Sequence, residues 1–296
     1  MRWIGTALSR LRRYHGASTM TVKTDLLALM EEICGRLEMA PVYRLYIPEP
    51  RPHASSHTEF GLVELEDGAA GLYYAWLGES QQGMGRRYSE EQLAGRHPLE
   101  LARYLAADDD AGRSLGMAAV NAISQSVFRR AGFTPPPAGD SMGSLALTGD
   151  DHLGMVGYFP SLVSRLREAR IRTTVIERKT RFSGDNDLIR VSLDIDDLRE
   201  CNKVLCTAST LLNDSIDQVL ERTVNAGTVV VVGPTAGFLP DPLFRRGVSA
   251  VGGTRIQDAQ AAIKALQQDR GLAEAAQRYL ITRENYPGVE ALLSEA

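Results

Sequence analysis

Hydrophobic residues in the first third of the chain follow a helical period and then a pattern typical of strands. Between residues 24 and 39 apolar side chains recur every three or four positions, which predicts an amphipathic helix that ends before Pro41. Residues 42–49 (VYRLYIPE) and 59–77 (EFGLVELEDGAAGLYYAWL) are rich in branched and aromatic residues, which favour strands. The sequence EDG at residues 66–68 predicts a hairpin turn within the second segment.

Two helices and a linker are expected next. A short helix is followed by a long, alanine-rich one over residues 110–132, with Asp110 as its N-cap and Gly132 as its C-cap. Residues 134–150 are rich in Pro, Gly and Ser, which predicts a linker. Residues 21–133 are therefore expected to form a small α+β domain.

Strands and helices alternate after residue 150. Short apolar runs, of which TVVVVG at residues 228–233 is the clearest, alternate with amphipathic segments, and residues 178–198 are expected to be irregular. Such alternation produces βαβ units, so residues 151–296 are expected to form a Rossmann-like domain with a doubly wound parallel sheet. The predicted fold class is α/β, with the small α+β domain preceding the Rossmann-like one.

The carboxyl ends of parallel strands meet at one edge of a sheet, where ligands bind. The strand-to-helix loops expected there include glycines 252 and 253. Their glycines let a ligand come close to the backbone, and the loops also contain hydroxyl groups and an amide, which is typical of a polar small-molecule crevice. Helix capping by Thr210 or Asn213 and turn formation by the glycines are alternatives that stay open. The candidate ligand-binding residues in these loops are Gly157, Tyr158, Phe159, Thr207, Ser209, Thr210, Asn213, Gly233, Pro234 and Thr235.

Glu177 supplies a carboxylate at this edge and is the candidate catalytic residue. It ends the next predicted strand about 20 residues after Gly157, a position from which an acidic residue can hold ribose hydroxyls. The dinucleotide fingerprint itself is missing, because residues 154–160 are GMVGYFP rather than GxGxxG. Alternatively, Glu177 is a solvated strand end that pairs with Arg172 or Arg178.

Composition argues against several classes of protein. The chain has 296 residues, of which 44% are hydrophobic and 24% charged, and its net charge is −4. This mild acidity argues against nucleic-acid binding, and no apolar run approaches the ~20 residues of a membrane span. Cys34, Cys201 and Cys206 are too scattered for a disulfide framework or a zinc site, so a reducing cytoplasm is the expected location.

The first 20 residues differ from the rest in charge. They hold four arginines and no acidic residue. We interpret residues 1–20 as a basic, disordered tail, or as the product of an upstream start codon ahead of Met20. An organellar targeting segment is the alternative.

Five motifs occur in a specific order: RSLGMAAVNAI at 113–123, GMVGYFP at 154–160, VIER at 175–178, TASTLLNDSID at 207–217 and VVVVGPTAGFLPDPLFRRGVSAVGG at 229–253. Together they resemble a bacterial and archaeal family known as the putative heavy-metal chelation domain family. The resemblance implies an enolase-N-terminal-like domain, a Rossmann-like domain and a cleft between them. It also implies that Asn121 is a ligand-binding residue. Ala208 and Ser209 depart from the glycine-containing turn expected for the family, which puts the shape of that loop in question.

Two classes of function fit these features. The first is binding or processing of a small polar or anionic ligand in the cleft, with a metal chelate or a divalent metal held by oxygen donors as one case. The second is a lyase, isomerase or transferase that uses Glu177 as acid or base, or a protein that binds a nucleotide-like cofactor through it. The expected partner is a small molecule rather than nucleic acid or a membrane, and a homodimer is left open. The sequence specifies neither ligand, metal nor reaction.

Overall fold

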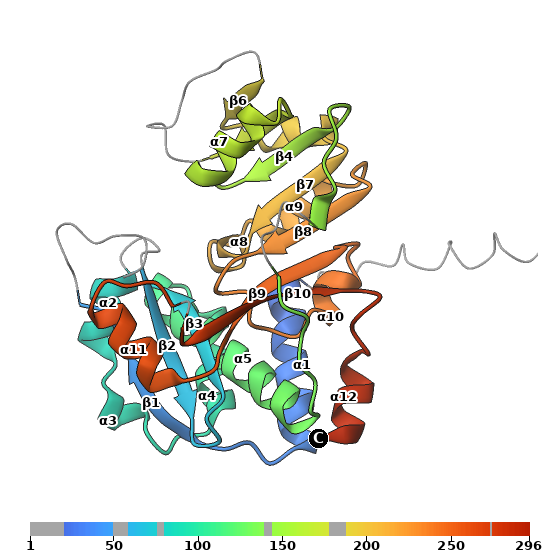
Figure 1. The fold of residues 1–296 in the computed structure, drawn as a ribbon. Helices are drawn as coiled ribbons and strands as arrows, with labels where there is room; N and C mark the ends of the chain where they lie inside the picture. Colours follow the sequence, from blue (N-terminus) through green and yellow to red (C-terminus); the bar gives the residue numbers. More distant parts are fainter. Residues whose placement is uncertain (1–20, 50–58, 76–79, 139–143, 178–187, 273) are drawn as a thin grey trace, which may run out of the picture.

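Two sheets organise the chain (Figure 1). The computed structural model describes residues 21–49, 59–75, 80–138, 144–177, 188–272 and 274–296. A small antiparallel sheet and a large, mostly parallel sheet each carry their own helices, which confirms the predicted α/β class with two units. No helix in these ranges is long and apolar enough to cross a membrane. The expectation for residues 1–20 lies outside the described residues.

The small sheet contains the predicted hairpin. Strands β1 (Val42–Tyr46), β2 (Phe60–Leu65) and β3 (Ala70–Tyr74) pair antiparallel in that order. Gly68 in the turn between β2 and β3 has a φ of 82°, a left-handed conformation that favours glycine. The helices of this half are α1 (Val22–Arg36), α2 (Ser80–Arg87), α3 (Glu90–Leu93), α4 (Pro98–Ala102), the 3-10 helix η1 (Arg103–Ala106) and α5 (Asp110–Arg130).

The long helix α5 begins and ends close to the predicted positions. Its N-cap is Asp109 rather than the predicted Asp110, because the Asp109 carboxylate accepts the backbone N–H of Gly112 at 2.9 Å. Gly132, at a φ of 64°, follows the last helical turn in the left-handed conformation that commonly ends helices.

Helix α5 is buried on every side from Ser114 to Phe128. It lies so close to β3 that a Cβ atom on Gly71 would be 2.0 Å from the carbonyl oxygen of Ala118. The same atom would be 2.4 Å from the backbone nitrogen of Ala122. Glycine at position 71 therefore sets the distance between helix and sheet.

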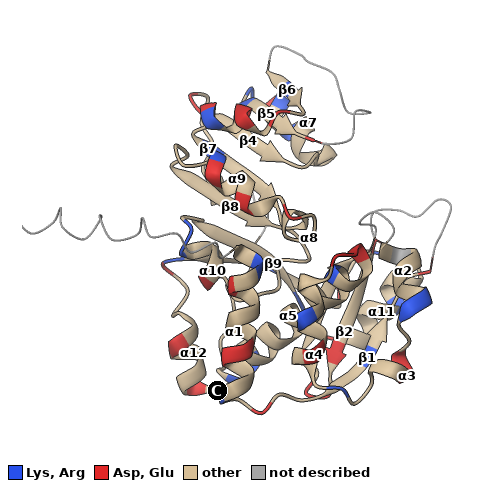
Figure 2. Cartoon of the chain, turned by 180° about the vertical axis from the view of Figure 1, so that it is seen from behind, with Lys and Arg blue, Asp and Glu red and all other residues tan. Residues whose placement is uncertain are grey.

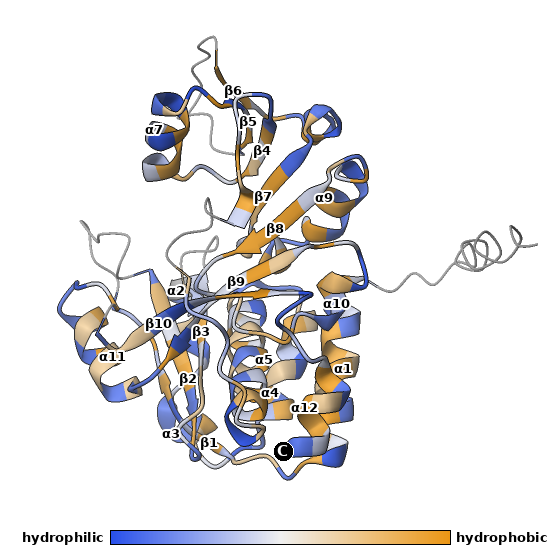
Figure 3. Ribbon diagram, turned by 45° about the vertical axis from the view of Figure 1, so that its right-hand side comes forward, coloured by the Kyte–Doolittle hydropathy of each residue, from blue (hydrophilic) through white to orange (hydrophobic). Residues whose placement is uncertain are grey.

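The large sheet has seven strands in the order β10-β9-β8-β7-β4-β5-β6. All neighbouring strands are parallel except β9 and β10. Few charged residues lie on its strands (Figure 2), and β7 and β8 are largely hydrophobic (Figure 3). The strands are β4 (His152–Val156), β5 (Arg172–Ile176), β6 (Ile189–Ser192), β7 (Lys203–Thr207), β8 (Thr228–Val232), β9 (Ala250–Ile256) and β10 (Ala276–Thr282).

The parallel strands have the order typical of dinucleotide-binding Rossmann folds. Numbered along the chain from β4, they read 3-2-1-4-5-6 from β6 to β9. The Rossmann-like prediction is thus confirmed for the sheet. The helices of this half are α7 (Pro160–Glu168), the 3-10 helix η3 (Ile195–Glu200), α8 (Ser209–Leu212), α9 (Ile216–Arg222), α10 (Asp241–Phe244), α11 (Ala259–Gln267) and α12 (Val289–Glu295).

Three expectations for this half were wrong. The segment 178–198, expected to be irregular, contains β6, and β10 adds an antiparallel edge strand that was not predicted. Gly252 and Gly253 lie inside β9 rather than in a loop. The reason is local packing, since a Cβ on Gly253 would be 2.5 Å from the hydroxyl of Tyr279 on β10.

The two halves of the chain share their cores. Helix α11, from the second half, packs on one face of the small sheet, where Ala259 and Ala262 join Leu62 and Leu72 in one apolar cluster (Figure 1). On the other side, α1 contacts α10. The predicted linker also takes part, because the backbone N–H of Ala138 donates to the carbonyl of Arg278 on β10 at 3.0 Å. Folding of either half therefore depends on residues from the other.

The contact between Gly71 and α5 predicts a large effect of one methyl group. We expect Gly71→Ala to lower the unfolding free energy by about 3 kcal/mol, because the new Cβ meets helix backbone that cannot rotate away. The melting temperature should fall by at least about 5 °C.

Gly35→Ala is the matched control. Gly35 lies in α1, and a Cβ there would have no atom within 4 Å, so this variant should be as stable as the wild type or slightly more stable. Equal melting temperatures for Gly71→Ala and the wild type would contradict the packing described here.

Asp151, just before β4, bonds the last residues of the predicted linker to the amino edge of the large sheet. Its Oδ2 atom accepts the backbone N–H of Thr148 at 2.7 Å and the ammonium of Lys203 at 3.0 Å, and its Oδ1 atom accepts the Asn202 amide at 3.0 Å. The Thr148 N–H, followed by Lys203 and Asn202, lowers the pKa of Asp151 to about 2. Lys203 also donates to the carbonyl of Ala146 at 2.8 Å.

A pH-dependent contribution to stability follows from Asp151. Because the pKa of an unfolded aspartate is about 3.9, the unfolded chain takes up this proton first as the pH falls. The stabilisation is present above about pH 4 and is lost as the pH falls towards 2. We expect Asp151→Asn to lower the melting temperature by about 3 °C at pH 7. The difference in melting temperature between this variant and the wild type should become smaller below pH 4. Asp150→Asn, at the exposed neighbouring residue, should have the melting temperature of the wild type both at pH 7 and below pH 4.

Candidate functional site

The strand order changes direction between β4 and β7. The chain runs outward from β4 through β5 to β6 and then returns to place β7 on the other side of β4. The loops that leave β4 and β7 therefore diverge at the carboxyl edge of the sheet. Such a switch point opens a crevice in doubly wound folds, and ligands bind there.

The loop after β4 is shaped by Gly157. Its φ is 94°, which favours glycine, and its backbone N–H donates to the carbonyl of Ile176 at 2.9 Å. A Cβ on Gly157 would lie 3.1 Å from Cγ2 of Thr207, so the ends of β4 and β7 lie against each other. Tyr158 and Phe159 follow, both half-buried, and Pro160 is the first residue of α7.

Glu177 connects the ends of β4 and β5. Its Oε2 atom accepts the backbone N–H of Tyr158 at 3.0 Å, and its own N–H donates to the carbonyl of Ser192 at 3.1 Å. Glu177 is half-buried. Arg172, one of its two expected partners, instead lies 3.6 Å from Glu200, and Arg178, the other, lies outside the described residues.

The loop after β7 presents two hydroxyls at the same edge. Thr207 and Ser209 are half-buried, and their hydroxyl oxygens are 3.0 Å apart. Thr210 is buried, and its hydroxyl donates to the carbonyl of Thr207 at 2.7 Å. Asn213 closes the next turn, because its Oδ1 atom accepts the hydroxyl of Ser215 at 2.6 Å. Thr207 and Ser209 are thus the better placed of the predicted residues in this loop.

The loop after β8 lies beside that of β7. The backbone N–H of Ala208 donates to the carbonyl of Val232 at 2.8 Å, and that of Gly233 donates to the carbonyl of Gly252 at 3.0 Å. Gly233 and Pro234 are half-buried, whereas Thr235 is buried. The structure therefore brings together the predicted residues of four strand ends, and their contact with a ligand stays a prediction.

Asn121 reaches this region from the interior. Its side chain is fully buried, and its Nδ2 atom donates to the carbonyls of Leu72 at 2.8 Å and Thr235 at 2.9 Å. Asn121 thus bonds β3 to the loop after β8, and its predicted role as a ligand contact stays a prediction. Its neighbours Ser124 and Gln125 were not predicted from the sequence. Their signal is a row of polar residues at helical spacing within an otherwise apolar helix.

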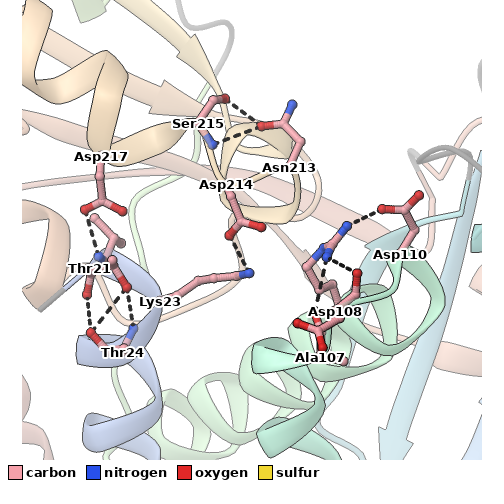
Figure 4. A network of polar contacts seen from close by, with 12 residues as sticks. Thr21, Lys23, Thr24, Ala107, Asp108, Asp110, Asn213, Asp214, Ser215 and Asp217 are labelled. Atoms are coloured by element: carbon pink, nitrogen blue, oxygen red, sulfur yellow. Dashed lines mark hydrogen bonds and ion pairs between the residues drawn. The ribbon is translucent and has the colours of Figure 1, made fainter.

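The N-terminal half contacts the second half at the turn that follows α8 and at the first turn of α9 (Figure 4). Lys23 lies 2.5 Å from the carboxylate of Asp214, which has a φ of 60°. The backbone N–H of Val22, the first residue of α1, donates to Asp217 at 2.9 Å. The start of α1 is therefore fixed to the segment that joins α8 to α9.

A separate cavity of about 740 Å³ lies between α2 and the start of α5. Its charged lining is balanced, because Arg87 pairs with Asp109 at 2.6 Å and Arg113 pairs with Asp110. The described lining comes from α2 and from residues 108–113, so the predicted site residues do not form it.

The thiols of the chain are poor metal ligands in this structure. Burial raises the pKa of Cys34 and of Cys201 to about 11 and that of Cys206 to about 12, which keeps all three protonated. Among the residues that the structure describes, no group of three or more His, Cys, Asp or Glu side chains could hold a metal ion. The polar groups at the ends of β4, β5 and β7 are carboxylate, hydroxyl and backbone groups, which suit hard rather than soft metal ions.

Two solved structures share this fold at low sequence identity. A protein of unknown function from Pyrococcus horikoshii is 21% identical, with a TM-score of 0.65, over 88% of this chain and 100% of that one. Another, from Desulfitobacterium hafniense, is 17% identical, with a TM-score of 0.62, over 87% of this chain and 98% of that one.

One curated relative matches about half of the chain. It is an uncharacterized protein of Methanocaldococcus jannaschii, 32% identical over 154 residues. The match covers 51% of this chain and 57% of the relative.

Two family models match the chain, and both carry the description "putative heavy-metal chelation". One covers residues 58–124, which include the small hairpin and most of α5. The other covers residues 140–283, which include the whole large sheet. With models of the same description matched in both halves, the chain belongs to the putative heavy-metal chelation family.

Proposed function

We propose that the protein binds a small polar or anionic ligand, specifically a metal chelate, in the crevice between the ends of β4 and β7. The observation that carries the proposal is the reversal of strand order at this point. Half-buried polar groups from adjacent strand ends surround it, among them Glu177, Thr207 and Ser209. Lys23, from the N-terminal half, pairs with Asp214 in the turn after α8, the helix that follows β7.

A chelated metal suits these donors better than a bare heavy-metal ion. Soft ions need thiolate or thioether ligands, whereas the thiols here are buried and protonated. A chelate presents carboxylate or hydroxyl oxygens at its surface, which backbone N–H groups and hydroxyls can bind. The Glu177 carboxylate can complete the coordination of a hard, partly complexed ion. The description of the family supports the same ligand class.

A second candidate is a nucleotide-like cofactor, such as an adenine nucleotide or S-adenosylmethionine. The observation in its favour is the position of Glu177, directly after β5, the second strand of the Rossmann order. In that order an acidic residue at this position binds ribose hydroxyls. If Glu177 does not bind a cofactor, its carboxylate beside the loop of Tyr158 can instead act as an acid or base.

A thermal-shift panel separates the two candidates. The probes are ferric citrate, nickel citrate, the metal ions alone, citrate alone, ATP, NAD and S-adenosylmethionine. We expect a metal citrate at about a hundred times its Kd to raise the melting temperature by about 5 °C or more, with no shift for its separate components. A shift with an adenine-containing probe alone would instead favour the second candidate. Absence of any shift would contradict both.

Glu177→Gln tests the carboxylate. Glutamine can still accept the N–H of Tyr158, so the melting temperature of the free protein should change by less than about 2 °C. Affinity for the probe that responds in the panel should fall about tenfold, because a charged contact is lost. The control Glu168→Gln, at the exposed end of α7, should keep wild-type affinity. Unchanged or tighter binding by Glu177→Gln would show that the carboxylate does not contact the ligand.

A further inference from the structure

Three successive carbonyl groups in the loop after β8 accept hydrogen bonds from buried side chains. Thr235 O accepts from Asn121 Nδ2 at 2.9 Å, Ala236 O accepts from the hydroxyl of Tyr279 at 3.2 Å, and Gly237 O accepts from Gln125 Nε2 at 2.7 Å. We call the three donors Asn121, Gln125 and Tyr279 the carbonyl clamp. Its donors come from α5 and from β10, elements that belong to different halves of the chain.

Further bonds join the clamp into one network. Gln125 Nε2 is also 3.3 Å from the hydroxyl of Tyr279, so two of the three donors contact each other. At the end of the same loop, the backbone N–H of Leu239 donates to the hydroxyl of Ser124 at 3.2 Å. Every polar side chain in this row of α5 therefore acts on residues 235–239.

Two glycines make room for the clamp. A Cβ on Gly253 would lie 2.3 Å from the carbonyl oxygen of Ala236. A Cβ on Gly237 would lie 3.1 Å from Cβ and Cγ of Asn121. The sequence motif that contains both glycines thus allows the loop to approach Asn121 and Tyr279 closely.

The two amides of the clamp contact the loop through their nitrogens. Asn121 Nδ2 and Gln125 Nε2 donate to the carbonyls of Thr235 and Gly237, whereas the buried amide oxygens of both residues accept no hydrogen bond within the described part of the chain. The position of the loop therefore depends on the orientation of both amide groups.

The clamp is connected to the crevice by a single turn. The backbone N–H of Ala236 donates to the carbonyl of Gly233 at 3.0 Å, which closes a turn over residues 233–236. Gly233 and Pro234, half-buried at the crevice edge, therefore move with the carbonyls that the clamp holds.

We propose that Asn121, Gln125 and Tyr279 are positioning residues, which hold Gly233 and Pro234 in the orientation that the ligand requires. Ligand affinity then depends on side chains that lie in the interior and need not touch the ligand. The expected effect on ligand affinity rests on the proposed function, since it assumes that a ligand binds at this edge. The positioning of the loop by the three side chains is a property of the free protein and can be tested without a ligand.

Tyr279→Phe and Tyr73→Phe form a matched pair. Both tyrosines are buried, and each hydroxyl donates to a backbone carbonyl, at 3.2 Å for Tyr279 and 3.1 Å for Tyr73. The acceptor of Tyr73 is Tyr46 in the small sheet, away from the loop after β8. Tyr279→Phe also removes the contact with Gln125 Nε2, so the comparison between the two variants is made on the loop itself rather than on the melting temperature.

The first measurement is hydrogen–deuterium exchange of the free full-length chain. We expect Tyr279→Phe to accelerate exchange of the peptide 233–239 by about fivefold, which corresponds to about 1 kcal/mol, whereas Tyr73→Phe should leave that peptide unchanged. Equal exchange of this peptide in both variants would overturn the proposal, whatever ligand the protein binds.

The second measurement is the affinity for ferric citrate by isothermal titration. Tyr279→Phe should raise the Kd by about fivefold or more, and Tyr73→Phe should keep the wild-type value. A faster-exchanging loop with unchanged affinity would overturn the link between clamp and ligand. If the wild type does not bind ferric citrate, the proposed ligand class fails, while the exchange result still decides whether the clamp positions the loop.

Gln125→Met provides a second, independent variant. It keeps the length of the side chain but removes the donor to Gly237, so it should accelerate exchange of the same peptide. Because Gln125 and Tyr279 contact each other, the double variant should show a smaller effect than the sum of the two single ones. Strict additivity would contradict a single network.

Discussion

A backbone turn that runs through a protein interior needs a hydrogen-bond donor for each of its carbonyl groups. In the loop after β8 of this protein, α5 and β10 supply the donors: α5, a helix buried from Ser114 to Phe128, contributes Asn121 and Gln125, and β10 contributes Tyr279. Asn121 bonds both β3 and the loop after β8, so the amide of one residue fixes the small sheet and the large sheet to the same helix. Three successive carbonyls of the loop after β8 are thereby paired with buried side chains.

Periodicity and turn chemistry were enough to predict most of the fold. The hairpin, the long helix and the alternating strands of the second half all follow from local patterns that burial reinforces. β10 was missed because its first residues, Ala276 and Gln277, do not resemble a buried strand, and its pairing with β9 is a tertiary contact. Gly253 was assigned to a turn because sequence cannot show the side chain that covers it, here the ring of Tyr279.

The candidate site was predictable in outline only. Residues at the ends of parallel strands could be named in advance, because topology alone places them at one edge. Thr207 and Ser209 are half-buried, whereas Thr210 is buried. This difference depends on side-chain rotamers and on neighbouring loops, and the spacing of hydrophobic residues in the sequence does not predict either. Asn121 was singled out by the family resemblance, but its bonds to two backbone carbonyls became visible only in three dimensions.

The position of α11 has a consequence for how the protein is made. The small sheet is complete once residue 74 has left the ribosome, yet the apolar face around Leu62 and Leu72 is covered by a helix that ends at Gln267. During synthesis this face stays uncovered until almost the entire chain has been made, and exposed apolar strands of nascent chains are prone to associate. The first sheet therefore completes its apolar packing only after α11 has been synthesised, late in the chain.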